Sequence, residues 1–384
     1  MKRTRHLPLG NGYDLWPIAK TLLETSLPSR SRILRSPFHN GKTAVVFQDS
    51  AGGNAEVLLL GSWIKASNFG LYLIIFWLRW KARSQAILTI LKSLEADFLC
   101  LQEVDEYDTF YKKNMENLGY ASIYIQRSGR KRDGCGIFYN QNSAELVIEE
   151  EIDYNDLVDT VEDGTTSPKE KYGVLVSGNK EEPKAGSKLK DSQADRGDPN
   201  DPRVRLKRDC VGIMAAFRLQ NPSSHHVIIA NTHLYWDPEW ADVKIAQAKY
   251  LLSRLAAFKD LVSDKFDCSP PIILAGDFNS VPGDQVYQYL VSGTNSMGPE
   301  MADDLPMPLS SVYAFTRGEP EFTNCTPGFT GTLDYIFFSP SGDLKPVSYL
   351  ELPEAESSDV IGGLPNYFHP SDHLPIGAEF ELEA

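Results

Sequence analysis

The string Gly-Asp-Phe-Asn at 276–279 places a carboxylate and an amide two residues apart in the chain. The apolar run that precedes it, residues 271–275, is typical of a fully buried strand. We therefore expect Asp277 and Asn279 where that strand ends, and loops at strand ends are where scaffolds present catalytic groups.

A second string, His-Pro-Ser-Asp-His at 369–373, sets the Asp372 carboxylate beside the His373 imidazole, before a strand-like stretch at 374–380. A nearby carboxylate fixes the tautomer of such an imidazole. A carboxylate, an amide and a carboxylate–imidazole pair are the groups needed to split a phosphate ester. If they converge in space, the chain is an enzyme.

Three further polar side chains lie at the ends of predicted strands. Glu103 follows an apolar run at 98–101, His233 follows one at 227–230, and Asp334 belongs to one at 333–338. Any one alone is better explained as a loop carboxylate, a core histidine or a turn residue. Their coincidence carries the inference of a site.

In-line cleavage of a phosphodiester needs an activated water, a cation on a non-bridging oxygen and neutralisation of the developing charge. Glu103 suits Mg²⁺, which prefers oxygen ligands and takes few carboxylates. Asp277 would accept the proton of the water. The neutral Asn279 can hold the phosphate, and His373 can donate to the phosphoryl or leaving oxygen.

The formal net charge of −14 over 384 residues argues against nucleic-acid binding through bulk electrostatics. A metal enzyme escapes that argument, because its cation supplies local positive charge. Two basic clusters are interpreted as solvated surface. They comprise Arg127, Arg130, Lys131 and Arg132, and then Arg203, Arg205, Lys207 and Arg208.

We expect residues 1–68 to form a poorly ordered or atypical leader and residues 69–384 to form one domain, with a disordered acidic insertion at about 162–203. The apolar run at 69–78 is too short for a membrane-spanning helix. Apolar spacing predicts a helix from Trp80 to Leu94, and Asp237 with Pro238 predicts the start of another. The expected cellular location is the cytoplasm or the nucleus, and the Arg- and Ser-rich leader keeps import into an organelle as an alternative.

Several strings resemble the endonuclease/exonuclease/phosphatase superfamily in type and order. They are Leu-Gln-Glu-Val at 101–104, Thr-His at 232–233, Gly-Asp-Phe-Asn at 276–279, Leu-Asp-Tyr at 333–335 and Ser-Asp-His at 371–373. Trp-Asp-Pro-Glu at 236–239 and Phe-Thr-Asn at 322–324 resemble its carbon catabolite repressor deadenylase and nocturnin branch. Residues 131–139 and 231–247 look most like plant nocturnin-like members. The resemblance runs from residue 80 to the C-terminus, apart from the insertion.

The resemblance implies a four-layer α/β sandwich, with two mostly antiparallel sheets flanked by helices. It also implies Mg²⁺-dependent 3′-to-5′ removal of adenylate from RNA tails, releasing 5′-AMP, with Mn²⁺ as an alternative ion. By carry-over, Glu103 is the metal ligand and Asp277 the general base. The other implied roles are phosphate binding by Asn279 and His233, transition-state stabilisation by His373, orientation of His373 by Asp334, and contact of Asp372 with the metal waters.

Pro238 and Phe329 resemble a pair that sandwiches a terminal base, a form of stacking with little sequence readout. The alternative for Pro238 is simple helix initiation. The expected partner is RNA, at poly(A) 3′ ends. The sequence shows no leucine-rich segment for docking to a deadenylase complex, so docking would use other surfaces.

One departure from the family lies before Trp80, where the family has a strand carrying an Asn that helps place the metal. Asn54 and Asn68 are the nearby candidates, and neither lies in a strand-like context. Two alternatives to a deadenylase stay open, the first because of the nocturnin resemblance and the second because of this departure. One is a phosphatase acting on a small nucleotide, such as the 2′-phosphate of a dinucleotide. The other is a catalytically impaired RNA-binding module.

Overall fold

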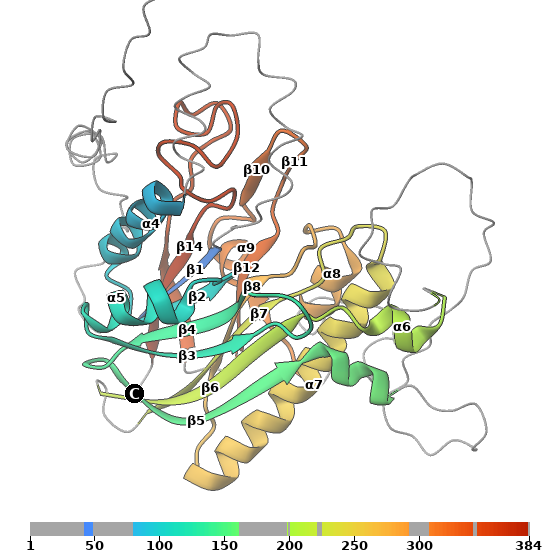
Figure 1. The fold of residues 1–384 in the computed structure, drawn as a ribbon. Helices are drawn as coiled ribbons and strands as arrows, with labels where there is room; N and C mark the ends of the chain where they lie inside the picture. The colour runs from blue at the N-terminus through green and yellow to red at the C-terminus, as the bar shows by residue number, and fades with distance from the viewer. Residues whose placement is uncertain are drawn as a thin grey trace, which may run out of the picture.

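Two six-stranded sheets form the centre of the computed structural model, which describes residues 42–48, 80–160, 198, 200–220, 225–291, 307–340 and 344–382 (Figure 1). The first sheet has the order β13 (Leu344–Tyr349), β14 (Ile376–Leu382), β1 (Lys42–Gln48), β2 (Phe98–Gln102), β4 (Gly134–Asn140), β3 (Tyr120–Gln126). The second has the order β5 (Ala144–Asp153), β6 (Val211–Leu219), β7 (His226–His233), β8 (Ile272–Asp277), β12 (Asp334–Phe338), β9 (Ser310–Ser311).

Each sheet contains one parallel pair among antiparallel neighbours. The parallel pairs are β1 with β2 and β7 with β8. β2, β7 and β8 lie inside their sheets, where nearly all of their residues are buried, and β2 and β8 accordingly consist mostly of apolar residues. All six residues of β8, for example, are buried.

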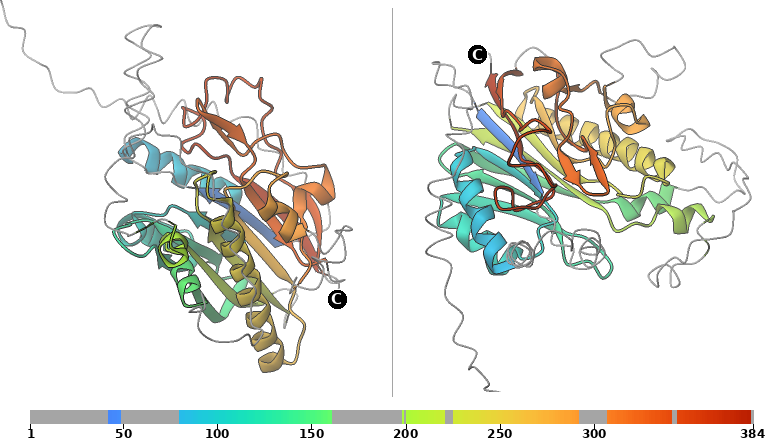
Figure 2. Two further views of the ribbon diagram at one scale, coloured as in Figure 1. Left: turned by 90° about the vertical axis from the view of Figure 1, so that its right-hand side faces the viewer. Right: turned by 90° about the horizontal axis from the view of Figure 1, so that it is seen from above.

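Helices cover the outer faces of both sheets (Figure 2). On the first sheet these are α4 (Trp80–Leu94) and α5 (Lys112–Glu116), which follows a π-helical turn at Tyr107–Tyr111. On the second they are α7 (Ala241–Phe266) and α8 (Gln285–Val291), beside a 3₁₀ turn at Tyr154–Thr160. A third apolar cluster fills the space between the sheets. The expected four-layer sandwich is confirmed.

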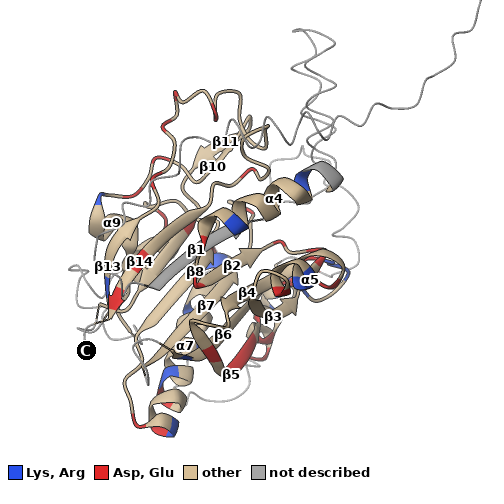
Figure 3. Cartoon of the chain, turned by 90° about the vertical axis from the view of Figure 1, so that its left-hand side faces the viewer, with Lys and Arg blue, Asp and Glu red and all other residues tan. Residues whose placement is uncertain are grey.

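Acidic side chains gather at one edge of the second sheet. The edge strand β5 carries four glutamates, and Figure 3 shows its acidic segments at the rim of the second sheet. Charged side chains on an edge strand oppose pairing with another chain. Among the described residues, no helix combines the length and the apolar character that crossing a bilayer requires.

The N-terminal region differs from the sequence expectation. β1 lies inside the segment predicted to be a leader, and it occupies the middle of the first sheet, between β14 and β2. The apolar run at 69–78 and the candidates Asn54 and Asn68 lie outside the described residues. A strand is thus present before Trp80, but its sequence, Lys-Thr-Ala-Val-Val-Phe-Gln, contains no Asn.

Two local boundaries also differ. Most of the predicted insertion lies outside the described residues, but its last residues include the start of α6 (Pro202–Leu206). The Asp201 side chain caps this helix by accepting a hydrogen bond from Arg203 N at 2.9 Å. α7 begins at Ala241 rather than at Asp237. Asp237 instead caps the preceding turn, since its Oδ1 accepts from Glu239 N at 3.0 Å.

Candidate active site

The carboxyl ends of β7 and β8 bring His233 and Asp277 together. The two residues are partners in the parallel register, and Asp334 is the antiparallel partner of Asp277 on the other side. Neighbouring partners in a sheet project to the same face. Asp334 begins β12, in agreement with its place near the start of the strand predicted at 333–338. The antiparallel direction still places it at the same edge.

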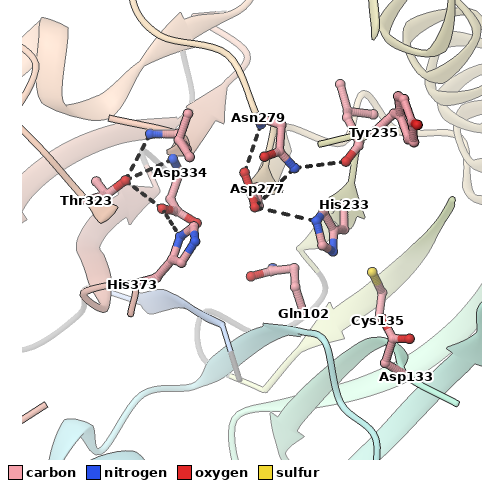
Figure 4. Close-up of polar contacts among 12 residues, drawn as sticks. Gln102, Asp133, Cys135, His233, Tyr235, Asp277, Asn279, Thr323, Asp334 and His373 are labelled. Carbon is pink, nitrogen blue, oxygen red and sulfur yellow. Dashed lines mark hydrogen bonds and ion pairs between the residues drawn. The ribbon is translucent and has the colours of Figure 1, made fainter. Parts of the chain in front are cut away.

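Asp334 is held between a threonine and a histidine (Figure 4). Its Oδ2 accepts from Thr323 Oγ1 at 2.5 Å and lies 2.8 Å from His373 Nδ1. Thr323 Oγ1 in turn accepts from the backbone N–H groups of Leu333 and Asp334 at 3.0 and 3.1 Å. Thr323 belongs to a string noted only as a branch signature, and its role in fixing Asp334 was not predicted.

The two histidines of the site are held in opposite protonation states. Burial disfavours a charged His373, but the Asp334 carboxylate outweighs it and raises the pKa of His373 to about 10. Burial, followed by the charges of Arg127 and His373, lowers the pKa of His233 well below its usual value. At neutral pH the site therefore contains one imidazolium and one neutral imidazole.

Asp277 is almost completely buried, and both its oxygens are contacted. Oδ1 accepts from Asn279 N at 2.8 Å, while Oδ2 lies 3.3 Å from Asn279 Nδ2 and 3.5 Å from His233 Nε2. Burial and then the neighbouring Asp334 raise the pKa of Asp277. A carboxylate with a raised pKa suits a general base near neutral pH.

Asn279 has its amide hydrogens directed at oxygen acceptors of the chain. Besides Asp277, its Nδ2 donates to Leu234 O at 2.9 Å. Its backbone has a φ of 47°, a left-handed conformation that is uncommon outside glycine. Buried Lys244 stabilises this turn by donating from Nζ to Asn279 O at 2.7 Å. Nothing in the sequence marks Lys244 beyond its place in a predicted helix.

Glu103 follows directly after β2, also in the left-handed region with a φ of 56°. Burial, and then the charges of Asp372 and Asp133, raise the pKa of Glu103 to about 8. Asp372, Asp277 and His373 all act on Glu103 electrostatically, which places it at the same site. A cation there would offset this repulsion and return Glu103 to its charged form.

The residues present fit an oxygen-preferring cation. Ligand atoms of Asp277, Asp334 and His373 lie within 4.8 Å of one another, although His373, as an imidazolium bonded to Asp334, has no lone pair to offer a cation. Two buried oxygens have no hydrogen-bond partner among the described residues. They are Oε1 of Gln102, which precedes Glu103 in the chain, and Oδ1 of Asp372, which precedes His373. Orphaned acceptors beside carboxylates suit a hydrated cation, because its water ligands are donors.

Arg127 corrects the interpretation of the first basic cluster as solvated surface. Its guanidinium is largely buried, donates from Nε to Asp209 O at 3.0 Å and pairs with Asp133 at 3.0 Å. Its charge acts on both His233 and Glu103. The sequence reasoning missed this fixed positive charge at the site, because nothing in a run of four basic residues marks the one that is buried.

The two residues expected to sandwich a base lie on separate exposed segments. Pro238 is exposed in the turn before α7. Phe329, 42% exposed, begins β11 (Phe329–Gly331), which pairs with β10 (Asn324–Thr326) in a two-stranded ribbon. The ribbon joins the site, since Asn324 forms an isolated bridge with His373. The sandwich itself stays a prediction.

Comparisons with known proteins show the family to which the chain belongs. Residues 75–373 match the Endonuclease/Exonuclease/phosphatase family. The chain is 64% identical over 308 residues to Carbon catabolite repressor protein 4 homolog 4 of Arabidopsis thaliana, covering 79% of this chain and 71% of that one. It is 30% identical over 318 residues to a probable CCR4-Not complex 3′-5′-exoribonuclease subunit Ccr4 of Vairimorpha ceranae, covering 78% of this chain and 58% of that one.

A solved structure shares the fold. ANGEL2, described as a 2′,3′-cyclic phosphatase and crystallised with adenosine-2′,3′-vanadate, matches with a TM-score of 0.63 and 24% identity, over 90% of this chain and 96% of that chain. The chain spans little more than half the length of the Ccr4 subunit that it matches.

Proposed function

Because this chain belongs to the endonuclease/exonuclease/phosphatase family, and to its carbon catabolite repressor branch, we propose that it is a Mg²⁺-dependent 3′-to-5′ exoribonuclease that shortens poly(A) tails and releases 5′-AMP. The observation that carries the hydrolytic part is the register of three strands, which gathers His233, Asp277 and Asp334 at one sheet edge. The substrate rests on the printed activity of the Ccr4 relatives.

The chain's own residues supply the proton chemistry. Asp277, fixed on both oxygens, takes the proton of the attacking water. His373, kept charged by Asp334, stabilises the negative charge that develops on the phosphoryl oxygens.

Binding and orientation fall to the other members of the site. The neutral His233 and Asn279 orient Asp277; they are also proposed to contact the phosphate, which for Asn279 requires an amide hydrogen that is now donated to Leu234 O or Asp277 Oδ2. Arg127 contributes fixed positive potential from the side of His233 and Glu103. Glu103, with Asp372 and the orphaned Gln102 oxygen, would hold a Mg²⁺ ion, which when bound polarises the phosphate.

Product analysis tests the proposal. The purified chain with Mg²⁺ is incubated with oligoadenylate and, separately, with a dinucleotide that carries a 2′-phosphate. We expect a ladder of shortened oligoadenylates with 5′-AMP, and no reaction with a chelator. Inertness towards oligoadenylate with robust phosphate release from the dinucleotide would establish a nucleotide phosphatase instead. Inertness towards both would leave the RNA-binding alternative.

A further inference from the structure

Trp236 is an aromatic side chain left on the surface close to the catalytic groups. It is 63% exposed and follows His233 by three residues. Three residues of chain span at most about 11 Å, so its backbone stays near the site. The intervening segment is also fixed, since Leu234 N donates to Asp277 O at 2.9 Å and Tyr235 N to Gln247 Oε1 at 2.9 Å.

The Trp236 ring lies next to a cluster of aromatic and guanidinium groups. Trp240 is buried between two guanidinium groups, with Arg205 at 3.9 Å and Arg208 at 4.0 Å from its ring centroid. Tyr235 bridges the two tryptophans, at 6.1 Å from Trp236 and 5.9 Å from Trp240. Cation–π contacts of this kind hold the rings in fixed planes.

The same aromatic and guanidinium groups fasten α6 to the loop. Arg205 pairs through both Nε and NH2 with Asp242 of α7, at 2.6 and 2.7 Å. The sequence predicted that Arg205 and Arg208 belong to a solvated surface cluster. These contacts show that the prediction is wrong for both residues. Arg203 and Lys207, from the same cluster, are exposed. Arg208 lies 5.4 Å from the ring centroid of Tyr235, which contacts Trp236, so a positive charge lies one ring away from Trp236 in a chain whose net charge is −14.

We infer that Trp236, with the exposed Arg203 and Lys207 of the α6 segment, forms a binding rim for single-stranded RNA upstream of the linkage that is cut. An exposed aromatic ring beside cationic side chains is how proteins hold single strands without reading their sequence, because every base has a stacking face. This inference rests on the proposed exoribonuclease function and adds a second contact region beyond the terminal nucleotide.

Substrate length is the test. We compare Trp236→Ala with the unmodified chain on the dinucleotide ApA and on an oligoadenylate of about ten nucleotides, within the range of single-strand site sizes. For the longer substrate, kcat/KM is expected to fall roughly tenfold, mainly through KM, as for one lost stacked base. Trp236→Phe restores most of it. Phe315→Ala, which removes an exposed ring of α9 (Val312–Thr316), is the matched control.

The outcomes separate the two proposals. An equal loss on both lengths would mean that Trp236 supports the fold or the chemistry, and no loss on either would mean that it does not meet RNA. Both overturn the rim while leaving the exoribonuclease intact. Failure of the unmodified chain to cut either RNA overturns the proposed function itself.

Salt dependence provides a second readout. Binding of fluorescein-labelled oligoadenylate to the Asp277→Asn chain is measured by anisotropy over a range of salt concentrations. Adding Lys207→Ala is expected to reduce the slope of log Kd against log salt by about 0.7, the value for one phosphate contact with a single strand. Lys265→Ala, at the far end of α7, serves as control, and an unchanged slope for Lys207→Ala contradicts the rim.

Discussion

Gln102 Nε2 donates a hydrogen bond to Asn231 Oδ1 at 2.6 Å and so joins the two sheets beneath the site. Asn231 completes the link, because its Nδ2 donates to Leu101 O and Gly136 O, each at 2.9 Å, on the opposite sheet. Both side chains have no exposed surface. They form a polar layer between the apolar inter-sheet core and the catalytic groups, since Asn231 precedes His233 by two residues and Gln102 precedes Glu103.

Replacing Asn231 by Ala should destabilise the protein by about 3 kcal/mol, because buried donors and acceptors on both sheets lose their partner. Urea unfolding measures this change. Activity should fall as well, since the distance between Glu103 and His233 is no longer fixed. Asn142→Ala, which removes an exposed amide, is the control. Unfolding at the same urea concentration as the unmodified protein would show that the layer contributes nothing.

Asp277→Asn should reduce kcat by about 10²- to 10⁴-fold, the usual contribution of a general base. The same change should raise Tm at neutral pH, since it removes a buried carboxylate beside Asp334 whose pKa is already raised. Calorimetry and steady-state kinetics give both values. Asp260→Asn, at an exposed position, should alter neither. Retained activity would remove Asp277 from the mechanism.

Asp334→Asn should shift the alkaline limb of the pH–rate profile. In the unmodified chain His373 remains charged up to about pH 10, so the rate should be maintained up to that pH. Without the Asp334 charge the pKa of His373 moves back towards 6.5, and the rate should fall above that pH. The raised pKa also adds stability that is fully present below pH 6.5 and is lost as the pH rises through 10.

The chain provides a matched control for this prediction. His369 and Asp359 form another histidine–carboxylate pair, 3.5 Å apart, outside the catalytic cluster. Asp359→Asn should leave the alkaline limb in place. An Asp334→Asn profile that matches the unmodified one would show that Asp334 does not maintain the charge of His373.

Mg²⁺ should raise Tm more at pH 8 than at pH 6. The pKa of Glu103 is about 8 in the folded chain and 4.5 in the reference state, so the folded state binds more protons between these values and the metal-free protein loses stability as the pH rises. Mg²⁺ must displace that proton, and its affinity therefore weakens below pH 8. Glu103→Gln should abolish the gain.

Scanning fluorimetry and titration calorimetry, with and without Mg²⁺, check this without an activity assay. Glu149→Gln on the exposed edge strand β5 should behave as the unmodified chain. A Mg²⁺ effect that persists in Glu103→Gln would place the metal elsewhere.

Sequence reasoning identified the strand ends that carry Glu103, His233 and Asp277, because long apolar runs mark buried strands. It did not find that Asp334 is the register partner of Asp277, since an apolar run does not reveal which strand it pairs with or in which direction. Thr323, Lys244 and Arg127 were missed for a related reason: each acts through a partner distant in the chain, such as Asp334 or Asn279, and local patterns contain no record of such partners.

The pairing of β1 with β14 has a consequence for biosynthesis. Lys42 is the register partner of Phe380, so the first sheet joins the two ends of the described chain. Contacts between such distant segments are closed late and slow folding. On the ribosome, β1 must wait without its antiparallel neighbour until β14 has been translated and released. Until then one edge of β1 lacks its partner, although the other edge can already pair with β2, and the open edge favours non-native pairing in the nascent chain.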